Sequence, residues 1–185
     1  MSIIFYSILG FLGFVLLFGT FFIVRQQSAA IVERFGKFVS VRQSGLQIKI
    51  PIIDRVAGRV SLRVQQLDVV VETKTKDDVF VKIKVSVQYK VINDKVFDAF
   101  YKLDFPQDQI TSYVFDVVRA EVPKMILDDV FEKKDDVAIA VKSELNDAML
   151  NYGFDIIKTL VTDIDPDAQV KDSMNRINAS EREKV

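Results

Sequence analysis

The stretch VFVKIKVSVQYKV, Val79–Val91, decides the fold of the middle of the chain. Successive side chains of a β-strand point to opposite faces, so a period of two assigns each residue to a face. Every second position from Val79 is apolar, whereas the positions between them carry lysines, Ser86 and Gln88, with Phe80 as the one aromatic residue. We predict a long strand with one solvated face and one buried face, the latter made of Val79, Val81, Ile83, Val85, Val87, Tyr89 and Val91.

Two shorter alternating runs precede this strand. Val60–Val64 and Leu67–Val71 each place apolar residues at every second position, and the phase changes across Gln65–Gln66. A phase change of this kind is typical of a β-bulge, so we predict one long strand that contains a bulge or a bend. Lys76–Asp78 is expected to be the turn that joins it to Val79–Val91 as an antiparallel pair.

The segment IKIPIID, Ile48–Asp54, is apolar but contains Pro51. Proline cannot donate a hydrogen bond to a β-ladder and is therefore confined to edges and loops. The segment is predicted to be either an edge strand or a loop that lies on the sheet or on lipid.

From Asn93 onward the apolar spacing changes to the three-and-four pattern of helices. Asn93 or Asp94 is predicted to cap a short helix that ends at Tyr101. Pro106 suits the first turn of a second helix, and Pro123 should end or kink it.

A third helix is predicted to start at a cap, Asp135 or Asp136, and to stop at Gly153. The predicted inward-facing residues are Ile110, Val114, Val117 and Val118 in the second helix and Val137, Val141, Leu145, Ala148 and Met149 in the third. Phe154–Ile164 returns to a strand pattern, and Asp165 followed by Pro166 should start a last helix.

The last helix carries a short apolar seam. Val170, Met174 and Ile177 keep a spacing of four and three residues, whereas Glu181 takes the next seam position. Two heptads are too few to indicate a coiled coil from the pattern alone. The helix has no stop signal before Val185, so we expect the natural protein to continue beyond that residue.

The N-terminal run Ile3–Val24 contains no charged residue. As a helix its 22 residues would be about 33 Å long, enough to cross a hydrocarbon core of about 30 Å. Ser28 and Ala30 also form the small-x-small pattern of a signal-peptidase site, but the apolar run is too long for a signal and no Lys or Arg precedes it. We therefore predict a retained transmembrane anchor over 1–25, with the signal peptide as the alternative.

Charge is unevenly distributed behind this run. Residues 25–63 carry eight bases and two acids, whereas residues 64–185 carry seventeen bases and twenty-four acids. The basic flank predicts, by the positive-inside rule, a single-pass protein whose body is cytoplasmic. Membrane contact is predicted for the bases and apolar residues of this segment: Arg25, Arg34, Lys37, Arg42, Lys49, Ile50, Ile52 and Ile53.

Nothing in the sequence indicates catalysis, a cofactor or nucleic-acid binding. The chain has no Cys and no His, which excludes the usual zinc sites and Ser-His or Cys-His catalysis. Asp77-Asp78, Asp128-Asp129 and Asp135-Asp136 are interpreted as turn and helix-start acids. Asp163-x-Asp165-x-Asp167 begins like a calcium loop, but Ala168 and Met174 replace the required Gly and Glu. The basic residues lack interleaved aromatics, so nucleic acid is not expected as a partner.

Several blocks of the sequence resemble a known family. The first three resemble the SPFH, or band-seven, domain of stomatins, prohibitins and flotillins, and the last two are more similar to its hypersensitive-induced response branch. The blocks are QQSAAIVERFGKF (Gln26–Phe38), SGLQIKIPIIDRV (Ser44–Val56), ETKTKDDVFVKIKVSVQYKV (Glu72–Val91), YVFDVVRAEVPKMILDDVFEKKDDVAIAV (Tyr113–Val141) and YGFDIIKTLVTDIDPDAQVKDSMNRINASER (Tyr152–Arg182).

This resemblance implies an α+β SPFH domain over 26–165, strand-rich over 26–92 and helix-rich over 93–165. It also implies that 166–185 is the start of a long coiled-coil-type helix that joins copies of the chain, through Val170, Met174 and Ile177. It implies a non-enzymatic scaffold that assembles into large membrane-bound rings and organises lipids and client membrane proteins. The alternative is a regulatory subunit of a membrane-bound protease. Two departures are Ser44, where the family usually has Pro, and Ser2, where plant members of the branch carry a lipidated glycine. The anchor is therefore more similar to that of bacterial stomatin-like proteins.

Overall fold

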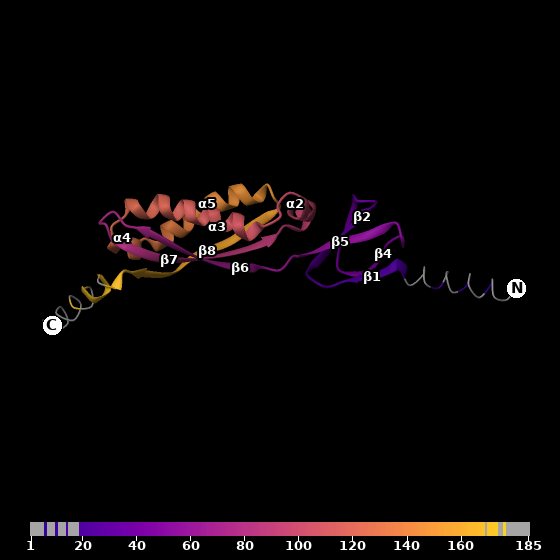
Figure 1. Ribbon diagram of the computed structural model, residues 1–185, viewed down its shortest axis with the longest axis horizontal. Helices are drawn as coiled ribbons and strands as arrows, with labels where there is room; N and C mark the ends of the chain where they lie inside the picture. Colours follow the sequence, from indigo (N-terminus) through magenta and orange to yellow (C-terminus); the bar gives the residue numbers. More distant parts are fainter. Residues whose placement is uncertain are drawn as a thin grey trace. The chain divides into compact units, whose positions relative to one another are not determined.

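The computed structural model describes residues 6, 10, 14, 19–168, 170–173 and 176 (Figure 1). These residues divide into two compact units. Unit 1 consists of the chain up to Arg63 together with Val91–Lys102, and unit 2 consists of Val64–Lys90 and the chain from Leu103 onward. The strand-rich stretch 26–92 is thus shared between the two units.

Unit 1 contains two small antiparallel sheets. In one, β1 (Phe21–Val24) pairs with β4 (Gly45–Ile48). In the other, β2 (Ser28–Arg34) lies between β3 (Lys37–Arg42) and β5 (Asp54–Ser61). The 3₁₀ turn η1 (Asn93–Lys95) and helix α2 (Val96–Tyr101) complete the unit. Its core is aliphatic and consists of Val24, Ala29, Ala30, Ile31, Val32, Val96 and Ala99.

The predicted anchor helix is wrong in its last turn. Phe21–Val24 forms β1, in which Phe21 pairs with Ile48 and Val24 with Gly45. Aromatic and β-branched residues favour strands, and the ladder to β4 satisfies their backbone groups. Most of the predicted span before Phe21 lies outside the described residues, and among the residues that are described no helix is both long and apolar enough to cross a bilayer.

The prediction of one long strand across Gln65–Gln66 is also wrong. β5 ends at Ser61 and pairs with β2, whereas β6 (Gln65–Lys74) pairs with β7 (Phe80–Val91) in unit 2. The change of phase marks the point where the chain leaves one sheet and enters another. Residues 49–53, between β4 and β5, form a loop, which is one of the two structures predicted for this apolar segment.

Unit 2 is built on a three-stranded sheet in the order β6-β7-β8, where β8 is Phe154–Pro166. β6 and β7 are antiparallel, with Val71 opposite Ile83, as predicted. Lys90 Nζ, near the end of β7, lies 3.8 Å from Asp155 Oδ2, near the start of β8. The Asp167 N–H, just after the end of β8, donates to the carbonyl of Phe80, the first residue of β7. β7 and β8 are therefore antiparallel too. The predicted buried face of β7 is confirmed from Val81 to Val91.

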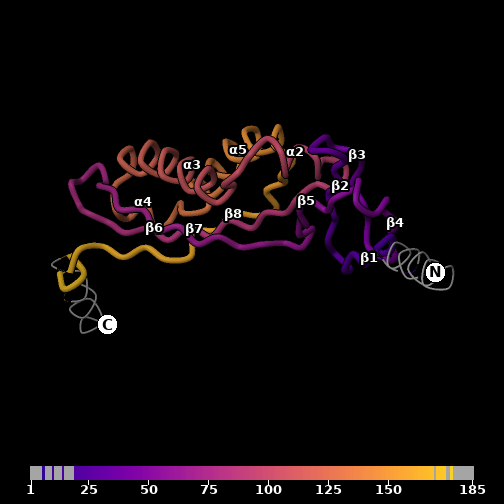
Figure 2. The backbone as a smooth tube through the Cα atoms, turned by 45° about the vertical axis from the view of Figure 1, so that its right-hand side comes forward, coloured from indigo at the N-terminus to yellow at the C-terminus, as the bar shows by residue number. Residues whose placement is uncertain are grey.

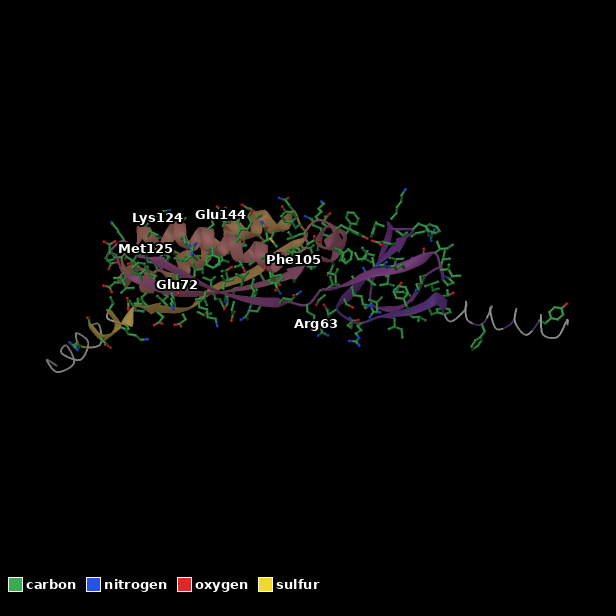
Figure 3. The ribbon with its side chains drawn as sticks, in the orientation of Figure 1. Arg63, Glu72, Phe105, Lys124, Met125 and Glu144 are labelled. Atoms are coloured by element: carbon green, nitrogen blue, oxygen red, sulfur yellow. The ribbon has the colours of Figure 1, made fainter. Side chains whose placement is uncertain are left out.

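Helices cover one face of this sheet. The helical segments are α3 (Pro106–Glu121), η2 (Val122–Lys124), α4 (Leu127–Glu132) and α5 (Lys134–Leu150). Figures 1 and 2 both show α3 and α5 on the same side of β6-β7-β8. In Figure 3, Lys124 and Glu144 lie on this helical side and Glu72 lies on the sheet. Pro106 at the start of α3 and the break before Pro123 are confirmed, as is the α+β class for the described part of the chain.

Several helix boundaries differ from the prediction. Neither Asn93 nor Asp94 caps α2, and Asp135 and Asp136 lie inside the first turn of α5. Helix α4 was not predicted, because its two turns are too short to show a periodic pattern. The predicted inward stripes are buried except at Ala148, which is half-buried. β8 extends to Pro166, so the described helical residues that follow begin at Ala168.

Candidate membrane-contact surface

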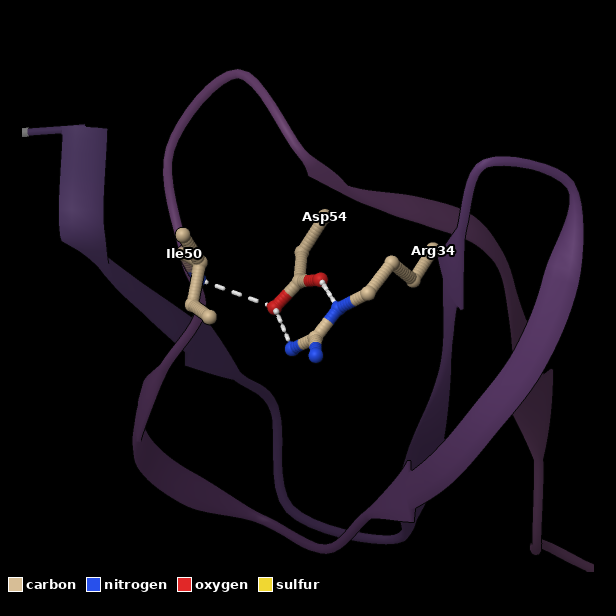
Figure 4. A network of polar contacts seen from close by, with 3 residues as sticks. All are labelled: Arg34, Ile50 and Asp54. Carbon is tan, nitrogen blue, oxygen red and sulfur yellow. Dashed lines mark hydrogen bonds and ion pairs between the residues drawn. The ribbon is translucent and has the colours of Figure 1, made fainter.

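Asp54 and Arg34 hold together one end of the three-stranded sheet of unit 1 (Figure 4). Arg34 ends β2 and lies directly opposite Asp54, the first residue of β5. The Arg34 guanidinium donates from Nε to Asp54 Oδ1 at 2.8 Å and from an Nη to Oδ2 at 3.3 Å. The Ile50 N–H also donates to Oδ2 at 2.9 Å, and the Asp54 N–H donates back to the Ile50 carbonyl.

This network favours the ionised form of Asp54. The hydrogen bonds from Arg34 are the main cause, and that from the Ile50 N–H adds to them, so the pKa of Asp54 lies below its ordinary value. Only 6% of the Asp54 side chain is exposed, whereas Arg34 is half-exposed. The pair therefore joins the turn after Arg34 to the loop before Asp54.

Each of these two segments presents apolar side chains to solvent. Phe35, in the turn between β2 and β3, is 83% exposed, and Ile52, in the loop between β4 and β5, is 92% exposed. Both have a left-handed backbone, with φ of 49° and 73°. A β-branched residue at positive φ is a genuine outlier, and such strain is concentrated at functional positions. We call the exposed residues Phe35, Ile50, Ile52 and Ile53 the apolar tip.

The two-stranded sheet adds a second exposed apolar surface. Phe21 is paired with Ile48 and Ile23 with Leu46, so the four side chains share one face of β1 and β4. All four are exposed, whereas Val24, on the other face, is buried. We call Phe21, Ile23, Leu46 and Ile48 the β1–β4 face. Contiguous exposed apolar side chains of this kind mark contacts with proteins or membranes.

The structure brings some of the predicted contact residues together and separates others. Lys37 pairs directly with Arg34, and Lys49 donates its N–H to Thr20 beyond the Phe21–Ile48 pair, so both bases lie near the apolar tip. Arg25 follows β1 at the opposite end from Phe21. Arg42, opposite Ala30, lies at the far end of the β2–β3 ladder, and its Nε is buried without a hydrogen-bond partner among the described residues. The bases at the tip are therefore Arg34, Lys37 and Lys49.

Phe35 and the β1–β4 face were missed by the sequence analysis. The sequence signal for the β1–β4 face is the alternation in GLQI, where Leu46 and Ile48 are apolar. FFIV is apolar at every position and ends a continuous apolar run, so it shows no alternation. Phe35 followed by Gly36 is a two-residue hairpin turn with φ of 49° and 78°, and a glycine at its second position is its sequence signal.

Two of the three predicted oligomerisation residues lie outside the described residues. Val170 is described and half-buried, whereas Met174 and Ile177 lie outside the described residues. In the part of the chain that the structure describes, no group of three or more acidic side chains is arranged to hold a metal ion.

Comparison with known proteins identifies the family. The sequence matches the SPFH domain / Band 7 family over residues 22–185, which is most of the chain. The chain belongs to the SPFH domain / Band 7 family. SPFH proteins are membrane-associated and are generally non-enzymatic scaffolds.

Two relatives illustrate the range of similarity. The chain is 46% identical over 160 residues to hypersensitive-induced response protein 4 of Arabidopsis thaliana, covering 86% of this chain and 55% of the relative. It is 31% identical over 162 residues to the mitochondrial stomatin-like protein 2 of Homo sapiens, covering 87% of this chain and 45% of the relative. The chain therefore spans about half the length of these SPFH relatives.

Proposed function

We propose that this SPFH chain is a membrane-anchored, oligomeric scaffold whose unit 1 rests on the cytoplasmic leaflet. The observation that carries the proposal is the apolar tip: exposed Phe35 and Ile52 both have a strained, left-handed backbone and lie in the two segments that the Arg34–Asp54 pair joins. Burying one such side chain fully contributes about 1.5–3 kcal/mol. Lys37 and Lys49 beside it would each add about 1 kcal/mol at an anionic leaflet.

The apolar run before β1 supports the anchor. Because β1 takes Phe21–Val24, the anchor is proposed for Ile3–Thr20. A helix of that length would be about 27 Å long, which is close to the thickness of a hydrocarbon core. β1 follows this run directly along the chain. We propose that the β1–β4 face contacts the membrane–water interface next to the anchor.

Oligomerisation is proposed for the C-terminal helix through Val170, Met174 and Ile177. It is supported by the family, whose members are generally scaffolds, and by the apolar spacing in the sequence. The mass of the full chain in a mild detergent tests it: a large defined multimer is expected, and a monomer at all concentrations would contradict it. A single membrane protease recovered at fixed stoichiometry would instead favour the regulatory-subunit alternative.

Leaflet contact can be tested at single positions, because the chain has no Cys. A fluorophore is attached to Ile52→Cys or Leu46→Cys, and the full chain is reconstituted in phosphatidylglycerol vesicles containing nitroxide-labelled acyl chains. Ile139→Cys is the matched control, since Ile139 is an exposed isoleucine on α5 in the acidic part of the chain. We expect strong quenching at positions 46 and 52 and little at 139. Equal quenching at 52 and 139 would overturn the proposed contact.

A further inference from the structure

Unit 1 contains a cavity that the proposed scaffold function does not use. Its volume is about 460 Å³, and it is lined by the start of β2, by β3 and by the η1–α2 segment. Binding sites for small molecules have volumes of roughly 300–1,000 Å³ and combine apolar walls with a few polar groups. The cavity is thus large enough for a small organic ligand.

The charge of the lining is unlike that of the surrounding sequence. Eight bases occur in residues 25–63, but none of them lines the cavity, and Asp94 is its single ionisable lining residue. Asp94 takes part in none of the ion pairs formed among the described residues. An anionic ligand would meet a carboxylate with no compensating base, whereas a cation would gain a partner.

One wall of the cavity is aromatic. Phe38 and Phe97 pack edge to face with centroids 4.7 Å apart, and each ring is 40% exposed. The electron-rich face of an aromatic ring attracts cations, and quaternary ammonium groups are recognised in this way.

Side-chain amides complete the lining. Gln26, Gln27, Gln43 and Asn93 line the cavity, and a side-chain amide can accept a hydrogen bond through its carbonyl oxygen from an N–H or O–H group of a ligand. A carboxylate, aromatic rings and amide carbonyls are together the groups that suit an organic ammonium ion.

We propose that this cavity binds an organic ammonium ion, with Asp94 as the counter-ion and Phe38 and Phe97 as the aromatic wall. The ammonium group is that of a free amine or of a lipid headgroup such as choline or ethanolamine. The proposal goes beyond the scaffold function and does not depend on it, because no residue of the apolar tip or of the β1–β4 face lines the cavity.

Choline is the probe for the first experiment. Saturation-transfer NMR follows its methyl protons with the full chain in a maltoside detergent, which has no ammonium group. We expect saturable choline binding, at least fivefold weaker binding of the uncharged isostere 3,3-dimethylbutan-1-ol, and a similar loss of choline binding in Asp94→Asn. Phe97→Leu should also weaken choline binding, since it removes half of the aromatic wall.

Asp98→Asn is the matched control. Asp98 lies one turn away on α2, pairs with Lys102 at 2.9 Å and does not line the cavity. Its variant should bind choline like the unaltered chain. The proposal is overturned if choline shows no saturable binding, if the uncharged isostere binds equally well, or if Asp94→Asn and Asp98→Asn behave alike.

A second arm distinguishes the two sources of the ammonium group. The chain is placed in nanodiscs of phosphatidylglycerol alone or of phosphatidylglycerol with phosphatidylcholine, and choline is titrated into each. A lipid headgroup in the cavity lowers choline occupancy only in the phosphatidylcholine discs, whereas a free amine as ligand leaves it equal in both. Failure of leaflet contact at Ile52 would leave the binding of free choline in detergent intact, so the two proposals can fail separately.

Discussion

Arg34 and Asp54, twenty residues apart in the sequence, form a two-point ion pair at the end of β2 and β5. Together with the β2–β5 ladder, in which Arg34 and Asp54 are register partners, the pair fixes the turn carrying Phe35 and the loop carrying Ile52 at the same end of the sheet. Arg34, which the sequence predicted to contact the membrane, therefore also positions these two segments. Its neighbours Lys37 and Lys49 remain the bases of the apolar tip.

Asp54→Asn should lower the free energy of unfolding at pH 7, because the amide cannot replace the charge-assisted bonds from Arg34. The folded-state pKa of Asp54 is lowered, so its contribution is present above the unfolded pKa of about 4 and is lost as pH falls through the folded value. Thermal unfolding of both proteins between pH 7 and pH 3 measures this. The difference between them should shrink as the pH decreases, and a constant difference would show that the ion pair does not contribute.

Ile52→Asn should separate stability from membrane contact. Asn tolerates a left-handed backbone, whereas an L-residue in this conformation costs about 1–2 kcal/mol, so the variant should be as stable as the unaltered chain or more stable by up to about 1 kcal/mol. Denaturant unfolding in detergent measures the stability. Quenching of a fluorophore at Leu46→Cys by nitroxide lipids measures the contact, and it should decrease in the same variant. A large loss of stability would show that Ile52 packs against the protein instead of serving the membrane.

Asp77→Ala should destabilise unit 2. Asp77 Oδ1 accepts hydrogen bonds from the Leu127 N–H at 3.1 Å and from Thr75 Oγ1 at 2.6 Å, and so caps α4 from a turn fifty residues away. Losing a helix cap exposes unpaired backbone N–H groups, and the thermal midpoint should fall by several degrees. The side chain of the neighbouring Asp78 forms an exposed ion pair with Lys74. Asp78→Asn, which suits the φ of 67° at this position, should therefore change the midpoint little. Equal effects at the two positions would exclude the capping role.

Gly58→Ala should lower the free energy of unfolding by about 1–3 kcal/mol through overpacking. A Cβ at Gly58 would lie 2.7 Å from Cζ of Phe100 and still closer to its Cε2. Chemical denaturation measures the loss. Phe100→Leu frees the space, so the double variant should recover part of the stability, and additive losses would show that the contact with the ring is not the cause.

Local pattern was sufficient for β7 and the longer helices of unit 2. The alternation of Val79–Val91 predicted β7 and its buried face, and the turn at Lys76–Asp78 predicted the antiparallel pair. These features can be predicted because buried positions recur every two residues in a strand and every three to four residues in a long helix. Helix α4 escaped prediction, since two turns are too short for a repeat and its cap comes from Asp77, far away in the sequence.

The sequence by itself determined the family and its α+β class, through the resemblance of five sequence blocks to the SPFH domain. It also determined the strand and helix patterns and the apolar N-terminal run, because these depend on local periodicity and composition. Only the tertiary structure decided that Phe21–Val24 is a strand, that Arg34 is bound to Asp54, and that the exposed residues Phe35 and Ile52 lie in segments joined by that pair. Each of these depends on which distant segments pair, and pairing is set by backbone hydrogen bonds and buried area summed over the whole unit. A continuous apolar run has the same pattern in the sequence whether it forms a helix in lipid or a strand in a sheet. For Phe21–Val24 the pairing with β4 decided that it forms a strand.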